Sequence, residues 1–352
     1  MGDVGRGPPD ARLGLGLRSG VPLRCSEGRS VSVFVTGGSG VVGREVLRLL
    51  IACGRDVGAL ARSDASASVV DGLGARAIRG DILDYAGLVD AMRGSETVFH
   101  IAGMNMMCVR DREPMRTVNV DGTRNVIRAA AAAGVRRVVY TSSAVTLGER
   151  RGEIGSESSR HRGWFLSAYE RTKFEAEHVA LGERTGVEVV AVNPSSVQGP
   201  GRVTGTGRLL LALLNGKLPF VIDTRISLVD ITDCARGHLL AETEGVSGER
   251  YVLSGFTMTM EQAVGMLGDV TGVPLRVRTV PASLVGLAGL ATEAVGRLRV
   301  RTPPFCAEMA RVIRFGHAYD GSRATRELGL RYTAPCDTIA RTVAWYRENG
   351  HL

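Results

Sequence analysis

A tyrosine and a lysine four positions apart are the residues of this chain best suited to move a proton. Tyr169 and Lys173 lie within residues 167–173, and the only other lysine of the 352-residue chain is Lys217. Side chains four positions apart on a helix share one face. An ammonium beside a phenol favours the phenolate, so it lowers the tyrosine pKa from about 10 toward neutrality. The spacing therefore predicts a tyrosine that exchanges protons with a substrate, although an ordinary helix surface pair has the same spacing.

A glycine-rich segment, residues 36–43, follows a predicted buried strand at 32–36 and leads into a predicted helix at 42–53. Glycines at such a turn let backbone N–H groups approach a diphosphate at the start of the helix. This context favours dinucleotide binding over a merely tight turn. The candidate cofactor-binding residues here are Thr36, Gly37, Ser39, Gly40, Val41, Val42 and Gly43.

The residue after the second predicted strand, 56–61, bears on the choice of dinucleotide. An acid at this position usually holds the ribose hydroxyls of NAD, whereas this chain has Arg62, whose guanidinium suits the 2′-phosphate of NADP. Asp64 lies close by, and Arg62 is one of many arginines, so it has a second interpretation as a solvated surface charge. The sequence therefore favours NADP and leaves NAD open.

Three later segments also follow predicted strands and are expected at the same site, because the carboxyl ends of parallel strands share one edge of a sheet. Asp81 and Ile82 should lie beside the adenine, and Ala102 and Gly103 beside the diphosphate and ribose. Ser143 should place a hydroxyl where a substrate carbonyl lies. The first two of these segments also have a plain interpretation as loops.

Short apolar segments alternate with segments of helical periodicity over the first part of the chain. Buried strands separated by helices are typical of an α/β fold with a doubly wound parallel sheet. Strands are predicted at 32–36, 56–61, 75–78, 97–101, 137–141 and 187–192, with helices such as 118–133 and 169–183 between them.

Beyond Pro194 the alternation weakens. Residues 228–231 and 250–254 are predicted strands that could return to the sheet edge, and helices are expected at 209–215, 260–271, 282–298 and 336–346. The predicted organisation is a disordered extension at 1–30, a dinucleotide-binding domain at 31–195 with return segments near 226–255, and a smaller C-terminal substrate-binding cap formed by 196–225 and 256–352.

The composition is that of an ordinary globular protein, with 44% hydrophobic and 23% charged residues. The formal net charge is +8, yet no basic run with interleaved aromatics occurs, so no nucleic-acid partner is expected. The longest apolar stretch, residues 281–292, is shorter than the roughly 20 residues that a membrane span needs. We expect a cytoplasmic protein with a small-molecule substrate and no membrane span, and a homodimer is one possible assembly.

Cysteines and histidines are dispersed along the chain. No Cys-x-x-Cys pair occurs, so the cysteines are predicted to be reduced core residues of a cytosolic protein. No histidines stand at the close spacing of a zinc site, so no metal is expected. The six cysteines are Cys25, Cys53, Cys108, Cys234, Cys306 and Cys336.

Together these motifs resemble the extended short-chain dehydrogenase/reductase family, which includes NAD-dependent epimerases and dehydratases, over about residues 31–352. Within it the chain looks most like dihydroflavonol-reductase-like proteins and hopanoid-associated sugar epimerases. The resemblance rests on the glycine-rich segment 36–43, Asp81-Ile82, Asn119, Ser143, Tyr169-x-x-x-Lys173 and the segment 193–201.

The resemblance implies a Rossmann fold and hydride transfer between a nicotinamide and a carbon that bears oxygen. Tyr169 would be the general acid for reduction and the general base for oxidation, and Ser143 would hold the substrate oxygen. Lys173 would contact the nicotinamide ribose and lower the tyrosine pKa, and Asn119 would maintain a proton relay. Pro194 and Ser196 would line the nicotinamide.

The chain departs from the pattern of its nearest relatives after the fourth predicted strand, where residues 104–108 read Met-Asn-Met-Met-Cys. Thioethers form an adaptable apolar wall, to which Trp164 and Phe165 could add. This composition favours an apolar or aromatic substrate, and simple core packing is the alternative.

The function predicted first is therefore an NAD(P)-dependent reductase or dehydrogenase that acts on a ketone or secondary alcohol. A sugar-nucleotide epimerase or dehydratase is the alternative. A non-catalytic NAD(P) sensor is a third interpretation, but such a protein has no need of Ser143, Tyr169 and Lys173 together.

Overall fold

A seven-stranded parallel sheet forms the centre of the computed structural model, which describes residues 32–282 and 306–352. The strand order is β10-β6-β5-β4-β1-β2-β3, and every neighbouring pair in this sheet is parallel. This confirms the predicted doubly wound α/β architecture. The strands are β1 Ser32–Thr36, β2 Asp56–Ala61, β3 Arg76–Arg79, β4 Thr97–His100, β5 Arg137–Thr141, β6 Glu188–Pro194 and β10 Arg250–Leu253.

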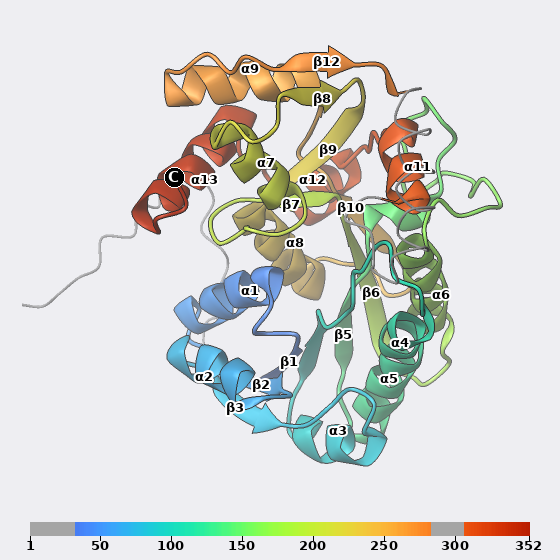
Figure 1. Ribbon diagram of the computed structural model, residues 1–352. Helices are drawn as coiled ribbons and strands as arrows, with labels where there is room; N and C mark the ends of the chain where they lie inside the picture. Colours follow the sequence, from blue (N-terminus) through green and yellow to red (C-terminus); the bar gives the residue numbers. More distant parts are fainter. Residues whose placement is uncertain (1–31, 283–305) are drawn as a thin grey trace, which may run out of the picture.

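Helices cover both faces of this sheet, as Figure 1 shows for α1 and α2 on one side and α5 and α6 on the other. Successive residues of β1 serve the two faces: Val33 and Val35 belong to one apolar cluster and Phe34 to the other. The flanking helices are α1 Val41–Ala52, α2 Asp64–Gly72 and α8 Ile231–Thr243 on one face, and α3 Tyr85–Met92, α5 Gly122–Ala132 and α6 Ala168–Gly182 on the other.

Three short segments connect these layers near the carboxyl ends of the strands. A π-helical turn precedes α5, and a 3₁₀ turn follows β5. Their bounds are α4 Glu113–Arg116, the π turn Thr117–Asp121 and the 3₁₀ turn Ala144–Leu147.

The C-terminal part adds two small sheets and further helices above the carboxyl end of the main sheet (Figure 1). Helices α9 and α13 pack together around an apolar cluster that contains Leu267 and Val343. The strands are β7 Ser196–Gln198, β8 Phe220–Ile222, β9 Arg225–Asp230, β11 Phe256–Thr259 and β12 Arg278–Val280, and the helices are α7 Thr206–Leu214, α9 Met260–Thr271, α11 Ala307–Phe315, α12 Ser322–Leu328 and α13 Pro335–Glu348.

Of the two strands predicted to return to the sheet, only one does. The strand predicted at 250–254 is β10, which extends the edge parallel to β6. The strand predicted at 228–231 is β9, which lies in a separate sheet between β7 and β11. The chain leaves the main sheet directly after Pro194, so β7 offers β9 a different partner. The extension predicted at 1–30 and nearly all of the helix predicted at 282–298 lie outside the described residues.

The prediction that all cysteines are reduced is wrong. Cys108 and Cys306 form a disulfide across 198 residues of sequence, with their Cα atoms 5.7 Å apart, and Cys53 is also disulfide-bonded. No local sequence motif predicts this bond, because only the fold brings such distant residues together. Cys234 and Cys336 are free. The cysteines therefore give no support to a cytosolic location.

The described residues contain neither a candidate membrane span nor a candidate metal cluster. No helix in residues 32–282 or 306–352 has the length and apolarity needed to cross a bilayer. Nor do those ranges contain a group of three or more His, Cys, Asp or Glu side chains arranged to hold a metal ion.

Candidate active site

The glycine-rich turn between β1 and α1 is built for close backbone approach. Gly37 has a φ of 76°, and a Cβ there would lie 2.5 Å from the backbone nitrogen of Ala102. A Cβ on Gly43 would lie 2.1 Å from the carbonyl oxygen of Gly37. Gly40 caps α1 without a side-chain hydrogen bond, so the first N–H groups of the helix, around Val41 and Val42, remain available to an anion.

A buried hydrogen-bond chain fixes the segment that faces this turn. Thr36 Oγ1 lies 2.7 Å from His100 Nδ1 and accepts a bond from the Ala102 N–H at 3.3 Å. His100 Nε2 in turn lies 3.0 Å from Thr123 Oγ1. Burial, and then the charge of Lys173, lower the pKa of His100 to about 3, so the ring stays neutral at physiological pH. Ala102 and Gly103 are thereby held against Gly37.

The predicted adenosine side lies along β2 and β3. Arg62 follows β2 directly and is exposed, and among the described residues it has no ion-pair partner, because Asp64 pairs with Arg79 at 3.4 Å. Asp81 accepts a bond from the Leu83 N–H at 3.0 Å, and Ile82 is buried. These residues follow neighbouring strands, as the sequence predicted.

Ser143, Tyr169 and Lys173 come together at the carboxyl end of β5. Helix α6 begins at Ala168, and Ser167 caps it by accepting a bond from the Glu170 N–H at 3.1 Å. The Ser143 side chain lies next to the Tyr169 phenol, where it acts to lower the pKa of that phenol. The cap and the helical spacing therefore present both Tyr169 and Lys173 to the carboxyl end of β5, which Ser143 follows.

Asn119 links the loop after β4 to helix α6. Its Oδ1 accepts from the Met104 N–H at 2.7 Å, while its Nδ2 donates to Met104 O at 2.9 Å and to Thr172 Oγ1 at 3.0 Å. A Cβ on Gly103 would lie 3.3 Å from Asn119 Oδ1 and 3.9 Å from Lys173 Nζ. The structure thus places Asn119 and Lys173 next to Gly103, where a larger residue would crowd them.

The electrostatics of the pair differ from the expectation. Burial raises the pKa of Tyr169, while the Ser143 hydrogen bond and the charge of Arg202 act to lower it. Lys173 is not among these influences, because its Nζ donates to Tyr140 Oη at 2.9 Å and to Thr141 O at 2.7 Å. The prediction that Lys173 lowers the pKa of Tyr169 is therefore wrong in this structure.

Lys173 itself is strongly perturbed. Burial lowers its pKa to about 7, and the carboxylate of Glu177 acts in the opposite direction. The ammonium thus sits close to the point where it loses its proton at neutral pH.

Glu177 and Asn193 are functional candidates that the sequence analysis missed. The buried Glu177 carboxylate accepts bonds from Ser142 Oγ, Asn193 Nδ2 and, at 3.0 Å, Thr146 Oγ1. It also pairs with Arg250 at 3.0 Å. This network fixes the strand end on both sides of Ser143. Its only local signal is the position of Glu177, one further turn along the face of α6 that carries Tyr169 and Lys173.

Arg202 is a second missed candidate. Its charge acts on the phenol of Tyr169, its Nε is buried without a hydrogen-bond partner, and burial lowers the pKa of its guanidinium. It follows the motif segment 193–201, in which Pro194 ends β6 and Ser196 begins β7. Ser196 Oγ donates to Thr206 Oγ1 at 3.2 Å, which ties this segment to α7.

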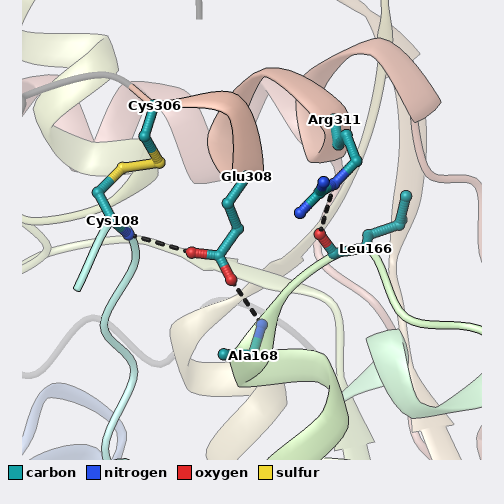
Figure 2. Close-up of a disulfide and its surroundings, with 6 residues drawn as sticks. All are labelled: Cys108, Leu166, Ala168, Cys306, Glu308 and Arg311. Carbon is teal, nitrogen blue, oxygen red and sulfur yellow. Dashed lines mark hydrogen bonds between the residues drawn. A yellow bond between two sulfur atoms is a disulfide. The ribbon is translucent and has the colours of Figure 1, made fainter. Parts of the chain in front are cut away.

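Residues 104–108, the Met loop, follow Gly103 and end at Cys108, which Figure 2 shows beside Cys306 and Glu308 of the C-terminal part. Met106 is 47% exposed, and Trp164, which makes an edge contact with Phe315 of α11, is 52% exposed. The loop ends at Cys108, whose disulfide attaches it to Cys306. Met106 and Trp164 are therefore not buried in the core, and both expose apolar surface that a ligand could contact.

The chain matches the 3-beta hydroxysteroid dehydrogenase/isomerase family over residues 34–232. Among curated proteins it is 34% identical to "Sterol demethylase protein B" of Methylococcus capsulatus, which covers 92% of this chain and 100% of that protein. It is 33% identical to a "Putative dihydroflavonol 4-reductase" of Synechocystis, with 91% and 95% covered. It is 28% identical to a "2-alkyl-3-oxoalkanoate reductase" of Shewanella oneidensis, with 90% and 87% covered.

Solved structures agree with these relatives. The crystal structure of gox2253 superposes with a TM-score of 0.81 at 29% identity, covering 92% of this chain and 100% of the other. A dTDP-glucose 4,6-dehydratase from Streptomyces venezuelae with NAD bound gives a TM-score of 0.73 at 26% identity, with 90% and 97% covered. The chain therefore belongs to the 3-beta hydroxysteroid dehydrogenase/isomerase family, a group of NAD(P)-dependent enzymes within the extended short-chain dehydrogenases/reductases.

Proposed function

We propose that this enzyme reduces a ketone on an apolar or aromatic metabolite to a secondary alcohol, with NADPH as the hydride donor. The observation that carries the proposal is the position of the Ser143 side chain next to the Tyr169 phenol, one helical turn from Lys173, whose Nζ lies beside Gly103. The cofactor supplies a hydride to the carbonyl carbon. Tyr169 donates its phenolic proton to the carbonyl oxygen, which Ser143 holds in place.

The neighbouring residues support this proton transfer. Lys173 would contact the nicotinamide ribose from the same helix face, and Asn119 holds Met104 and Thr172 so that the loop and helix keep their spacing. Pro194 and Ser196 line the nicotinamide. The remaining cofactor contacts in the proposal are Thr36, Gly37, Ser39, Gly40, Val41, Val42 and Gly43 at the diphosphate, Ala102 and Gly103 at the ribose, Asp81 and Ile82 at the adenine, and Arg62 at the 2′-phosphate.

The substrate class follows from the Met loop and from the names of the relatives. Met106 and Trp164 expose apolar surface near the site. The relatives are named for a sterol, a dihydroflavonol and a 2-alkyl-3-oxoalkanoate, whose names describe largely apolar or aromatic molecules. We propose that residues 196–225 and 256–352 form the cap that encloses such a substrate.

A cofactor-oxidation screen tests the proposal. Purified enzyme is mixed with NADPH or NADH and with aromatic ketones, steroidal ketones, 3-oxo acids and sugar-derived carbonyl compounds, and absorbance of the reduced nicotinamide is followed. We expect turnover with at least one apolar ketone. Turnover confined to nucleotide sugars would contradict the proposed substrate class.

The alternative is a sugar-nucleotide epimerase or dehydratase, which is supported by the likeness to the dTDP-glucose 4,6-dehydratase. Such an enzyme regenerates its cofactor in each cycle and therefore tends to retain it during purification, whereas a reductase must release it. Nicotinamide absorbance in the purified protein, with thermal stabilisation by a dTDP- or UDP-sugar, would favour this alternative.

The exposed position of Arg62 predicts a preference for NADPH over NADH. Replacing Arg62 by Gln should lower kcat/KM for NADPH by about 10-fold to 100-fold, because a charge-assisted bond to phosphate is lost, and should leave kcat/KM for NADH nearly unchanged. Arg331→Gln, which removes an exposed arginine near the C-terminus, is the control. Equal losses with both cofactors would show that Arg62 does not read the 2′-phosphate.

A further inference from the structure

Glu308 of helix α11 joins two segments that flank Tyr169, although it lies far from them in sequence. Its side chain is 6% exposed. Figure 2 shows its carboxylate between two backbone N–H groups: Oε2 accepts from Cys108 at 3.1 Å, and Oε1 accepts from Ala168 at 2.6 Å. Cys108 ends the Met loop, and Ala168 is the first residue of α6, directly before Tyr169. The Glu308 carboxylate therefore fixes the distance between the end of the Met loop and the start of α6.

Two further contacts attach the same end of α11 to these segments (Figure 2). Cys306, the residue that caps α11, is disulfide-bonded to Cys108. Arg311, one turn after Glu308, donates from Nε to Leu166 O at 3.2 Å. We call Cys306, Glu308 and Arg311 the α11 clamp.

The Met loop needs such an attachment at Cys108. This residue has a φ of 62°, and it is the one non-glycine with a positive φ within residues 32–282 and 306–352. A residue other than glycine rarely adopts this backbone conformation unless its surroundings hold it there. The Glu308 bond to the Cys108 N–H and the disulfide supply that constraint from the same helix.

We propose that Glu308 is a positioning residue of the reaction: it sets Tyr169 and the Met loop at the separation that the substrate requires, with the Cys108–Cys306 disulfide as the covalent part of the same clamp. This inference rests on the proposed reductase function. Both N–H bonds to the Glu308 carboxylate are charge-assisted, and the one from Ala168 is favoured by the dipole of α6, which begins there. A small displacement of a catalytic group lowers the rate steeply, so the clamp acts on kcat/KM without touching the substrate carbonyl.

The disulfide makes the clamp sensitive to reductant. A small dithiol donates two electrons and two protons to the bond, leaves two cysteine thiols and closes to its own disulfide. The Met loop is then attached to α11 only through Glu308. Reduction should therefore loosen the loop that contacts the substrate and raise KM more than it lowers kcat.

Glu308→Gln is the first test, because glutamine has the same shape but only one acceptor oxygen. Its amide nitrogen must face one of the two N–H groups, so one bond is lost and a donor is placed against a donor. We expect kcat/KM to fall by about 10-fold to 100-fold. Glu261→Gln is the matched control, since Glu261 is the acidic residue in the first turn of α9 and is exposed. Its kcat/KM should stay at the wild-type value.

Amide hydrogen exchange separates this inference from the reductase proposal. In Glu308→Gln, the N–H group of Cys108 or of Ala168, whichever faces the amide nitrogen, should exchange about 10-fold faster or more, and those of the central strands should not change. This measurement needs no substrate. If the wild type turns over no carbonyl compound, the reductase proposal fails. The exchange rates of Cys108 and Ala168 then still show whether Glu308 holds these two segments. Unchanged exchange at both residues, or full kcat/KM in Glu308→Gln, would overturn the role of Glu308.

Dithiothreitol tests the covalent part. It should raise the KM of the wild type by about 10-fold. The double variant Cys108→Ser with Cys306→Ser should have this raised KM already and should not respond to the reagent. A response retained in the double variant would assign the effect to another disulfide, such as that of Cys53, and would remove the Cys108–Cys306 bond from the proposal.

Discussion

Replacing Tyr169 by Phe is expected to lower kcat by about 10²-fold to 10⁴-fold, because the substrate oxygen then has no group positioned to give it a proton. The phenol lies at the Ser143 side chain, whereas the hydroxyl of Thr172 on the same helix is bonded to Tyr169 O and Asn119. NADPH binding should be kept within about twofold, since the glycine turn is untouched. Steady-state oxidation of NADPH and a fluorescence titration with NADPH measure the two quantities separately.

Tyr85→Phe is the control for this substitution, because Tyr85 is 45% exposed on α3 and lies at no catalytic residue. Its kcat should equal that of the wild type. Retained turnover in Tyr169→Phe would remove the tyrosine from the mechanism. Loss of NADPH binding together with turnover would mean that the substitution disturbs the fold, and not the proton transfer alone.

The parallel sheet could be predicted because each of its strands carries its own signal. Val33, Phe34 and Val35 are apolar on both faces, and this pattern identifies a buried strand without any knowledge of its neighbours. The glycine turn could be predicted for the same reason. Gly37 and Gly43 are required because backbone atoms a few residues away, or just after the adjacent strand β4, lie too close for a Cβ. Features that depend on local sequence and on a repeated topology can therefore be predicted.

The clamp and the second sheet could not be predicted, because they depend on contacts between distant segments. Nothing near Glu308 indicates that its carboxylate meets Cys108 and Ala168, and the disulfide spans 198 residues. Strand β9 looked like a return strand because a pattern of buried residues does not specify which strand will be its neighbour. Partner choice in these cases follows from the three-dimensional packing of the C-terminal part.

The spacing of Tyr169 and Lys173 gave their location but not their electrostatics. Spacing on a helix establishes that two side chains share a face. It does not tell how deeply each is buried, and burial is the largest influence on both pKa values. The spacing also does not reveal that the Lys173 ammonium donates hydrogen bonds to Tyr140 and Thr141 on β5. The location of this pair could therefore be predicted, and its protonation behaviour could not.

Replacing Lys173 by Met is expected to lower kcat/KM by at least about 100-fold and, at neutral pH and below, to stabilise the fold. Burial lowers the pKa of Lys173 to about 7 from an ordinary value of 10.5. Below pH 7 the folded and unfolded chains both carry the proton, so the cost of burying the charge is fully present. Between pH 7 and 10.5 the folded chain releases the proton while the unfolded chain keeps it, so the stability of the wild type rises with pH.

The methionine variant lacks this rise, so the difference between the two free energies of unfolding should shrink by about 2 kcal/mol between pH 7 and 9. Denaturant unfolding at both pH values measures it, and other titrating groups cancel in the difference. The exposed Lys217, replaced by Met, is the control and should show no such change. A pH-independent difference for Lys173→Met would mean that the buried ammonium keeps its proton throughout this range, because the partners on β5 and Glu177 then outweigh its burial.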